Sequence, residues 1–156
     1  MALDPPEIQL RKILDKKERK LNGIFRTNVG RFIPNLARDL VVNRTRRGFG
    51  VKKSGGAQFK LPKLSTNYIK KRRKSPDLSP DTSPEKANNT FTGDLIDSLE
   101  VRLLSGSRFE LRLPTQRARK INGYLVDMGR AWLNFSASET KKIRTAIRAV
   151  IRFVVK

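Results

Sequence analysis

The sequence contains no cysteine and no histidine among its 156 residues. Their absence excludes a disulfide framework, a zinc site of the usual Cys/His kind, a cysteine nucleophile and any catalytic arrangement that needs an imidazole base. Apolar residues are also scarce, since they make up 37% of the chain while charged residues make up 31%. These proportions disfavour a large-cored enzyme. We therefore expect a protein without catalytic activity, without a cofactor and without a bound metal.

Long apolar runs are missing as well. No segment approaches the roughly 20 consecutive apolar residues that a membrane-spanning helix requires, and residues 1–18 include acids instead of the apolar stretch of a secretory signal. No Gly-rich loop ends in Gly-Lys-Ser or Gly-Lys-Thr, which excludes a nucleotide-hydrolysing P-loop. We expect a soluble protein with no membrane partner that is made and assembled inside a cell.

Positive charge is what the sequence has in excess, and it is concentrated in the first half. The net charge is +21, and residues 1–74 hold 21 Lys and Arg against 5 acids, whereas residues 75–156 hold 14 against 9. Charge at this density destabilises a compact monomer unless counter-charge is nearby. A solvated surface that only maintains solubility is the alternative for any single run. The residues predicted to contact a polyanion or an acidic partner are Arg44, Arg46, Arg47, Lys52, Lys53, Lys70, Lys71, Arg72, Arg73 and Lys74.

The first third of the chain shows helical periodicity followed by a glycine-rich stretch. Apolar residues recur at three- and four-residue steps over 7–41, which predicts a long amphipathic helix. Pro34 disfavours helical geometry at Ile33, so we expect the helix to form in two pieces, with a kink or a break near residues 31–34. This helix is either a core element or a docking arm. Residues 44–60 carry four glycines among basic residues and are predicted to form a mobile loop.

The remaining chain predicts an α+β domain. Its small antiparallel sheet is packed by a C-terminal amphipathic helix and a long N-terminal helix, with extended basic loops. We assign residues 1–57 to an N-terminal helical region with the basic loop and residues 58–156 to an α+β region, both within one domain overall. The expected elements are a Ser65-capped helix to residue 74, a linker over 75–84, a Thr92-capped helix over 94–98, a hairpin of 99–103 with 109–113, a helix over 118–128 ended by Gly129, and a last helix with a Ser136/Glu139 capping box.

Two further features have a functional and a structural interpretation. Asp94, Asp97 and Glu100 stand three residues apart and could share a helix face as Mg²⁺ ligands of a nuclease. Nothing supplies a base or further ligands, and acids in the first turns of a helix are ordinary. Trp132 is the only tryptophan. We expect it to anchor the core, with a subunit contact as the second interpretation.

The order of several short motifs resembles one protein family. The stretch from Thr92 to Leu99, Thr-Gly-Asp-Leu-Ile-Asp-Ser-Leu, is similar to the Thr-Gly-x-Leu-x-x-Ser-Ile/Leu motif of tailed-phage tail-completion (neck) proteins, also described as virion-morphogenesis or minor tail proteins. As in that family, a hairpin follows, then a tyrosine with a later glycine, then Arg130-Ala131-Trp132-Leu133 in place of Arg-Pro-Phe-Leu, then a capped C-terminal helix. Upstream, residues 59–71 resemble the family's aromatic, Pro-Leu-Ser and basic-helix stretch. The matching motif residues are Thr92, Gly93, Leu95, Ser98, Arg130, Trp132 and Leu133.

The resemblance implies a structural virion component. Such proteins form a homo-oligomeric ring, commonly a hexamer, at the head-tail junction, where they end the tail tube or join it to the connector. It implies neighbouring tail-tube and connector proteins as partners, with packaged DNA in the channel as a further one. The expected location is the virion, and the host cytoplasm during assembly. The alternative is a basic nucleic-acid-binding protein of ribosomal or nucleoid type, which the charge also fits.

Overall fold

Six helices and two small antiparallel sheets make up the described part of the chain. The computed structural model describes residues 6–25, 28–52, 55–80, 82–90, 92–104 and 108–155. This mixture of helix and sheet confirms the predicted α+β class. The helices are α1 (Pro6–Phe25), α2 (Asn28–Arg46), α3 (Thr66–Arg73), α4 (Asp94–Asp97), α5 (Gln116–Asp127) and α6 (Ala137–Val155), and the strands are β1 (Phe49–Val51), β2 (Gln58–Lys60), β3 (Glu100–Leu103) and β4 (Phe109–Arg112).

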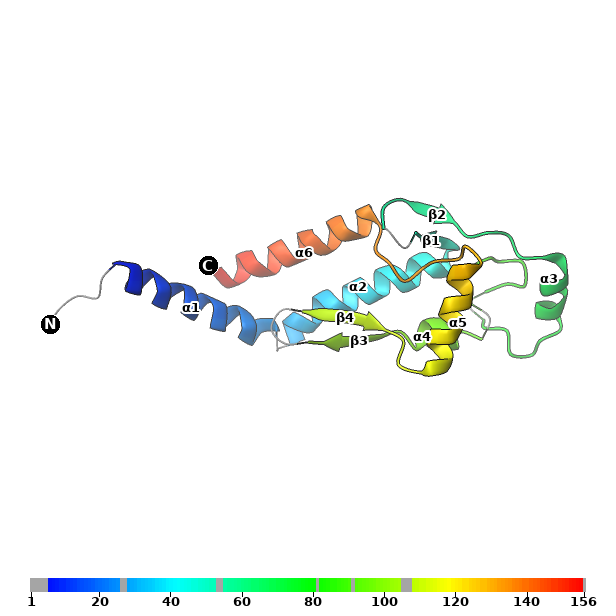
Figure 1. Cartoon of the computed structure of the whole chain (residues 1–156), viewed down its shortest axis with the longest axis horizontal. Coiled ribbons are helices and arrows are strands. Elements are labelled where there is room, and N and C mark those ends of the chain that lie inside the picture. The colour runs from blue at the N-terminus through cyan, green and yellow to red at the C-terminus, as the bar shows by residue number, and fades with distance from the viewer. Residues whose placement is uncertain are drawn as a thin grey trace.

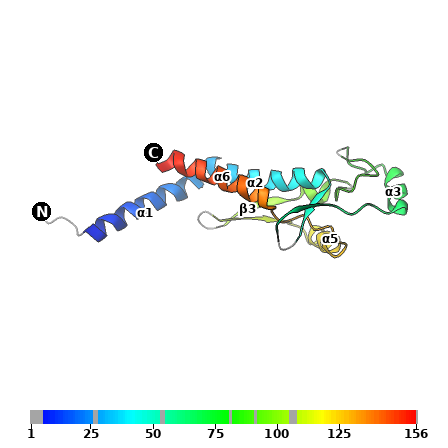
Figure 2. The same cartoon turned by 90° about the horizontal axis from the view of Figure 1, so that it is seen from above.

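Helix α2 is the central element of an elongated molecule. It packs against α6, against β1 and against the β3–β4 hairpin. Helix α1 extends outward from the start of α2, so that Pro6 lies at the opposite end of the molecule from α3 and α5 (Figures 1 and 2). None of the described helices combines the length and apolar content that crossing a bilayer requires.

The core draws on residues from both sides of position 57. One cluster joins Val41 and Val42 of α2 with residues between α4 and Trp132, and a second joins Ile33 and Ala37 with Ile143 of α6. Strands β1 and β2 pair directly across that boundary. Residues 1–57 and 58–156 therefore share one core within the described chain. Trp132 is fully buried, which confirms its predicted role as a core anchor.

Of the kink or break predicted near residues 31–34, the break is wrong. Pro34 lies inside α2, which begins at Asn28 and continues to Arg46. A proline inside a helix removes one backbone hydrogen bond. Ile33 and Ala37, which flank it, are only 2% and 0% exposed where α2 packs against α6. Burial of these side chains offsets the lost bond, so α2 remains a single helix through the proline.

The predicted mobile loop over 44–60 is also wrong for most of its length. Its first residues complete α2, and Phe49–Val51 then pairs with Gln58–Lys60 in an antiparallel register. Glycine is required at position 50 for packing, because a Cβ atom there would clash with the carbonyl oxygen of Ala131. The neighbouring Val51 donates its N–H to that same oxygen at 3.1 Å. Gly50 thus admits a close backbone contact and does not mark a loop, whereas Gly55 and Gly56 lie between the two strands.

The elements predicted for the second half are largely confirmed. Ser65 caps α3 by accepting the N–H of Tyr68 at 3.3 Å. The predicted hairpin is present as β3 and β4, and its turn residues 105–107 lie outside the described part. Helix α5 ends just before Gly129, whose φ of +71° suits glycine. The Ser136/Glu139 capping box at the start of α6 forms as predicted, with Glu139 accepting the Ser136 N–H at 2.8 Å.

Candidate binding cleft

Arg44, predicted as a surface contact, is instead buried at the end of α2. Its guanidinium donates hydrogen bonds to the Glu139 carboxylate and to the backbone carbonyls of Trp132 and Asn134. The side chains of the Arg44 and Glu139 pair are 0% and 4% exposed. Burial lowers the pKa of Arg44 from its ordinary value, and the charge of Glu139 partly opposes that shift. Arg44 therefore ties α2 to the start of α6, and its prediction as a polyanion contact is corrected.

Arg72 on α3 is the second predicted contact that the structure buries. It is 2% exposed, and its guanidinium donates to the carbonyls of Lys86 and Thr90 and to the hydroxyl of Thr82 at 2.8 to 3.1 Å. Its guanidinium carbon lies 5.9 Å from the ring centroid of Tyr68. Arg72 thus holds the segment after the 75–84 linker against α3. Burial inside the protein removes it from the set of exposed cations.

The other predicted contact residues lie on the surface, except Lys53, which is outside the described part. Arg46 is partly exposed and is paired with Asp97 at 2.7 Å. Arg73 is exposed and is paired with Glu85 at 2.7 Å, an interaction that holds the pKa of Glu85 below its usual range. These pairs neutralise part of the predicted basic surface. The exposed members are Arg47, Lys52, Lys70, Lys71, Arg73 and Lys74.

The Thr-Gly-x-Leu-x-x-Ser motif forms the short helix α4 and the turn before it. Gly93, and not Thr92, occupies the N-cap position, with a φ of +96°. Thr92 accepts the N–H of Asp94 at 3.3 Å, and Ser98 donates its hydroxyl to the carbonyl of Leu95 at 2.9 Å. A Cβ at Gly93 would lie 2.9 Å from an oxygen of Asp97, so this position accepts no larger side chain without movement. The motif thus builds one wall of the cavity described next.

Arg130 follows α5 and connects it by hydrogen bonds to the segment before α4. It is 7% exposed. Its Nε donates to the side-chain oxygen of Asn89 at 2.9 Å and its Nη1 to the carbonyl of Pro62 at 2.7 Å. Asn89 in turn donates to the carbonyl of Arg130 at 3.1 Å and adopts a left-handed φ of +50°. Burial lowers the pKa of Arg130, Tyr68 opposes this shift, and Arg72 adds to it.

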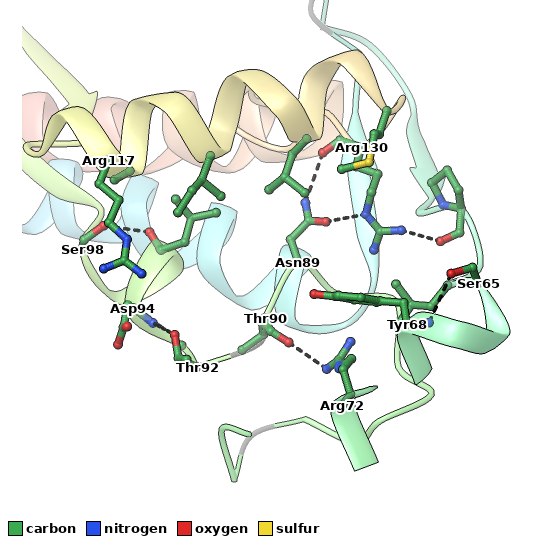
Figure 3. Close-up of a pocket in the computed structure, with 18 of the residues that line it drawn as sticks. Ser65, Tyr68, Arg72, Asn89, Thr90, Thr92, Asp94, Ser98, Arg117 and Arg130 are labelled. Carbon is green, nitrogen blue, oxygen red and sulfur yellow. Dashed lines mark hydrogen bonds between the residues drawn. The ribbon is translucent and has the colours of Figure 1, made fainter. Parts of the chain in front are cut away.

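These residues surround a cleft of about 790 Å³ between α3, α4 and α5. One end holds Arg72 and Arg130 on either side of Tyr68, and Arg117 and Asp94 lie at the other end (Figure 3). Polar side chains that line the cleft include Ser65, Thr90, Thr92 and Ser98. The apolar wall consists of Leu95, Ala118, Ile121, Leu125 and Met128.

The described lining of the cleft carries cations, hydroxyls and aliphatic side chains, and Asp94 is the one carboxylate among these described residues. Among the described residues no three acids lie close enough to hold a metal ion, which gives Asp94, Asp97 and Glu100 no ligand geometry. The cleft therefore suits an anionic group joined to an apolar one.

Only some of the residues that line this cleft could be predicted from the sequence. The motif residues Thr92, Gly93, Leu95, Ser98 and Arg130 all come together at the cleft. Leu133 lies apart, partly buried against the core with Trp132. Asn89, Arg117 and Met128 were missed. Their part depends on how α5 faces the 88–95 segment, and no local pattern in the sequence carries that information.

No family model matches this chain, and neither a curated protein nor a solved structure does.

Proposed function

We propose that this protein is a structural subunit of a tailed-phage particle, a tail-completion or neck protein that works in a homo-oligomeric ring and not as an enzyme. The observation that carries the proposal is the uncovered apolar face of α1. Leu10, Ile13 and Leu14 are 59%, 52% and 57% exposed on a helix that extends beyond the rest of the molecule (Figure 1). Apolar side chains grouped in this way are typical of a surface that a partner covers.

The motif resemblance supports the same proposal. The Thr92 to Leu99 stretch forms a compact turn that contributes Ile96 and Leu99 to the core and Leu95 to the cleft. The motif therefore has a clear structural purpose in this chain. The proposed location is the virion, and the host cytoplasm during assembly.

The surface charge supports an acidic neighbour. The cations that remain exposed on α3 are grouped on one short helix, and the α6 residues Lys141, Arg144 and Arg148 are exposed as well. Connector or tail-tube proteins with acidic faces, or DNA in the channel, would supply the missing counter-charge. Such contacts weaken with added salt because mobile ions screen them.

The test compares the assembly of two matched variants. Leu10→Glu/Leu14→Glu removes the apolar face and lowers the net charge by two. The control, Lys12→Gln/Lys16→Gln, lowers it equally on the other face of α1 with the same four-residue spacing. Light scattering after size exclusion should give a ring-sized particle for the natural chain and the control, and a monomer for the Leu variant. Monomers throughout, or a ring that survives in the Leu variant, would contradict the proposal.

A nucleic-acid-binding protein is the second candidate, and the exposed Lys70, Lys71 and Lys74 on α3 favour it. This role predicts that the purified monomer shifts naked DNA or RNA at physiological salt, with an affinity that falls steeply as salt rises. A ring-sized particle that does not bind naked DNA or RNA favours the neck role. A monomer that binds it favours the second candidate.

A further inference from the structure

The cleft contains two buried cations that no carboxylate of the described chain neutralises directly. Arg72 and Arg130 are 2% and 7% exposed, and their hydrogen bonds go to carbonyl, hydroxyl and amide oxygens. Glu85 influences Arg72 only through its charge, because its carboxylate is bound to Arg73. Burying a cation without a counter-charge is costly. This end of the cleft is therefore built for an anionic group.

Both guanidinium groups have nitrogen atoms that could still donate hydrogen bonds to an anionic group. Arg72 Nε is buried and has no hydrogen-bond partner among the described atoms. The hydrogen bonds that Arg130 donates use Nε and Nη1, which leaves Nη2 on the side of Tyr68 (Figure 3). The cleft's own carboxylate, Asp94, lies at the opposite end beside Arg117 (Figure 3).

The other wall requires the ligand to be apolar as well. Ile121 on α5 and Met128 just after it are 37% and 60% exposed and line the cleft together with Leu95, Ala118 and Leu125. A phosphate or a nucleic-acid backbone would satisfy the cations but leave this aliphatic surface in water. A peptide segment that carries a carboxylate close to an aliphatic side chain would satisfy both walls.

Residues 1–10 are one of the segments of the chain that have this chemistry. Residues 1–10, Met-Ala-Leu-Asp-Pro-Pro-Glu-Ile-Gln-Leu, include Asp4 and Glu7 and no Lys or Arg, in a protein whose net charge is +21. Proline is tolerated in the first turn of a helix, and α1 begins at Pro6, so Glu7 is presented from the first turn of a helix. Helix α1 begins at Pro6 at the far end of the molecule from the cleft, so a subunit presents this segment to another copy and not to itself (Figures 1 and 2).

We propose that the cleft of one subunit binds residues 1–10 of a second copy. The Asp4 and Glu7 carboxylates of that copy meet Arg72 and Arg130, and its Leu3 packs on the α5 wall. The contact joins different surfaces of two identical chains, which makes it heterologous. It goes beyond the proposed function, because it would hold in any assembly of this chain.

Disulfide cross-linking tests the contact cleanly because the natural chain has no cysteine. A full-length chain with Ala2→Cys is mixed with a chain that carries Lys63→Cys at the rim of the cleft. The matched control replaces the second chain with Lys120→Cys, which is also exposed but lies on α5 outside the cleft. We expect at least about ten times more cross-linked dimer with Lys63→Cys than with Lys120→Cys.

Two sets of additional substitutions identify the forces involved. In the first chain, Asp4→Asn/Glu7→Gln should reduce cross-linking at least about tenfold. A tenfold loss corresponds to about 1.4 kcal/mol of binding free energy. In the second chain, Ile121→Gln should reduce it, whereas Val126→Gln should not. Ile121 and Val126 are each 37% exposed on α5, and only Ile121 lines the cleft. Glu7, Ile121 and Val126 are exposed, so variants at these positions should fold.

Three outcomes would overturn the proposal. The first is equal cross-linking at positions 63 and 120. The second is cross-linking within a single chain that carries both Ala2→Cys and Lys63→Cys and that persists on dilution. The third is indifference to Asp4→Asn/Glu7→Gln together with protection of the cysteine at position 63 by a DNA oligonucleotide, which would assign the cleft to nucleic acid. A head-to-tail dimer that forms no ring would support the contact while contradicting the neck role.

Discussion

The buried pair of Arg44 and Glu139 allows a sharp test of what stabilises this fold. The substitution Glu139→Gln removes the negative charge and keeps a residue that suits the third position of a capping box. Arg44, whose side chain is 0% exposed, then remains buried without its counter-charge. Removing one partner of such a pair costs about 3–5 kcal/mol. A domain of this size has a total free energy of unfolding of roughly 5–15 kcal/mol, so the loss would be a large fraction of it.

Urea unfolding measures this loss directly. Trp132 is the only tryptophan and is fully buried, so its fluorescence reports unfolding of the core. With an m-value of about 2 kcal/mol/M, the midpoint should fall by roughly 1.5–2.5 M urea. The control is Glu110→Gln, which breaks an exposed pair with Arg102 at 3.7 Å and should cost less than about 1 kcal/mol.

A double-mutant cycle completes the test. Arg44→Met combined with Glu139→Gln removes both charges, so its cost should be clearly smaller than the sum of the two single costs. The reasoning is refuted if Glu139→Gln destabilises the protein no more than Glu110→Gln, or if the two single costs at Arg44 and Glu139 simply add.

Three further outcomes follow from the described geometry. Gly93→Ala should destabilise the protein by about 1–3 kcal/mol, because it forces a side chain into a φ of +96°, whereas Gly123→Ala in the interior of α5 should stabilise it by about 0.5–1 kcal/mol; thermal unfolding monitored by circular dichroism compares the two. Arg73→Gln should raise the pKa of Glu85 toward its ordinary value, and an NMR titration of Glu85 measures this change. In the natural chain the pair stabilises the fold at pH values above the ordinary pKa of a glutamate. That stabilisation is lost as the pH falls through the lowered pKa of Glu85. Replacing Lys70, Lys71, Arg73 and Lys74 with Gln while keeping Arg72 should weaken assembly and flatten its dependence on salt, and assembly that is unchanged at every salt concentration would exclude this helix from the contact.

The sequence predicted local structure well where the signal is local. The Ser65 cap, the alternating strands on either side of residues 105–107, and the Ser136/Glu139 box each depend on side chains a few residues apart. All three elements are present. The same holds for the end of α5 before Gly129, where a single residue type determines the conformation.

The sequence failed where a distant partner decides the outcome. Pro34 stays inside a helix because α6 covers its neighbours, and Gly50 lies in a strand because Ala131 approaches it closely. Arg44 and Arg72 carry the same charge as the surface cations beside them, so composition alone could not separate buried from exposed members. Their hydrogen-bond partners lie 10 to 95 residues away in the chain.

The placement of α1 and the cleft at opposite ends of the molecule gives each subunit a direction. An open chain of subunits joined through these two ends would be polar. The subunit at one end would have an unoccupied cleft, and the subunit at the other end would have an unbound N-terminal segment (residues 1–10). Only closure into a circle removes both at once, so the last subunit to join would form two contacts where every earlier one formed a single contact. A variant that keeps its cleft but lacks residues 1–10 could join one end of such an open chain of subunits, and no further subunit could then be added at that end.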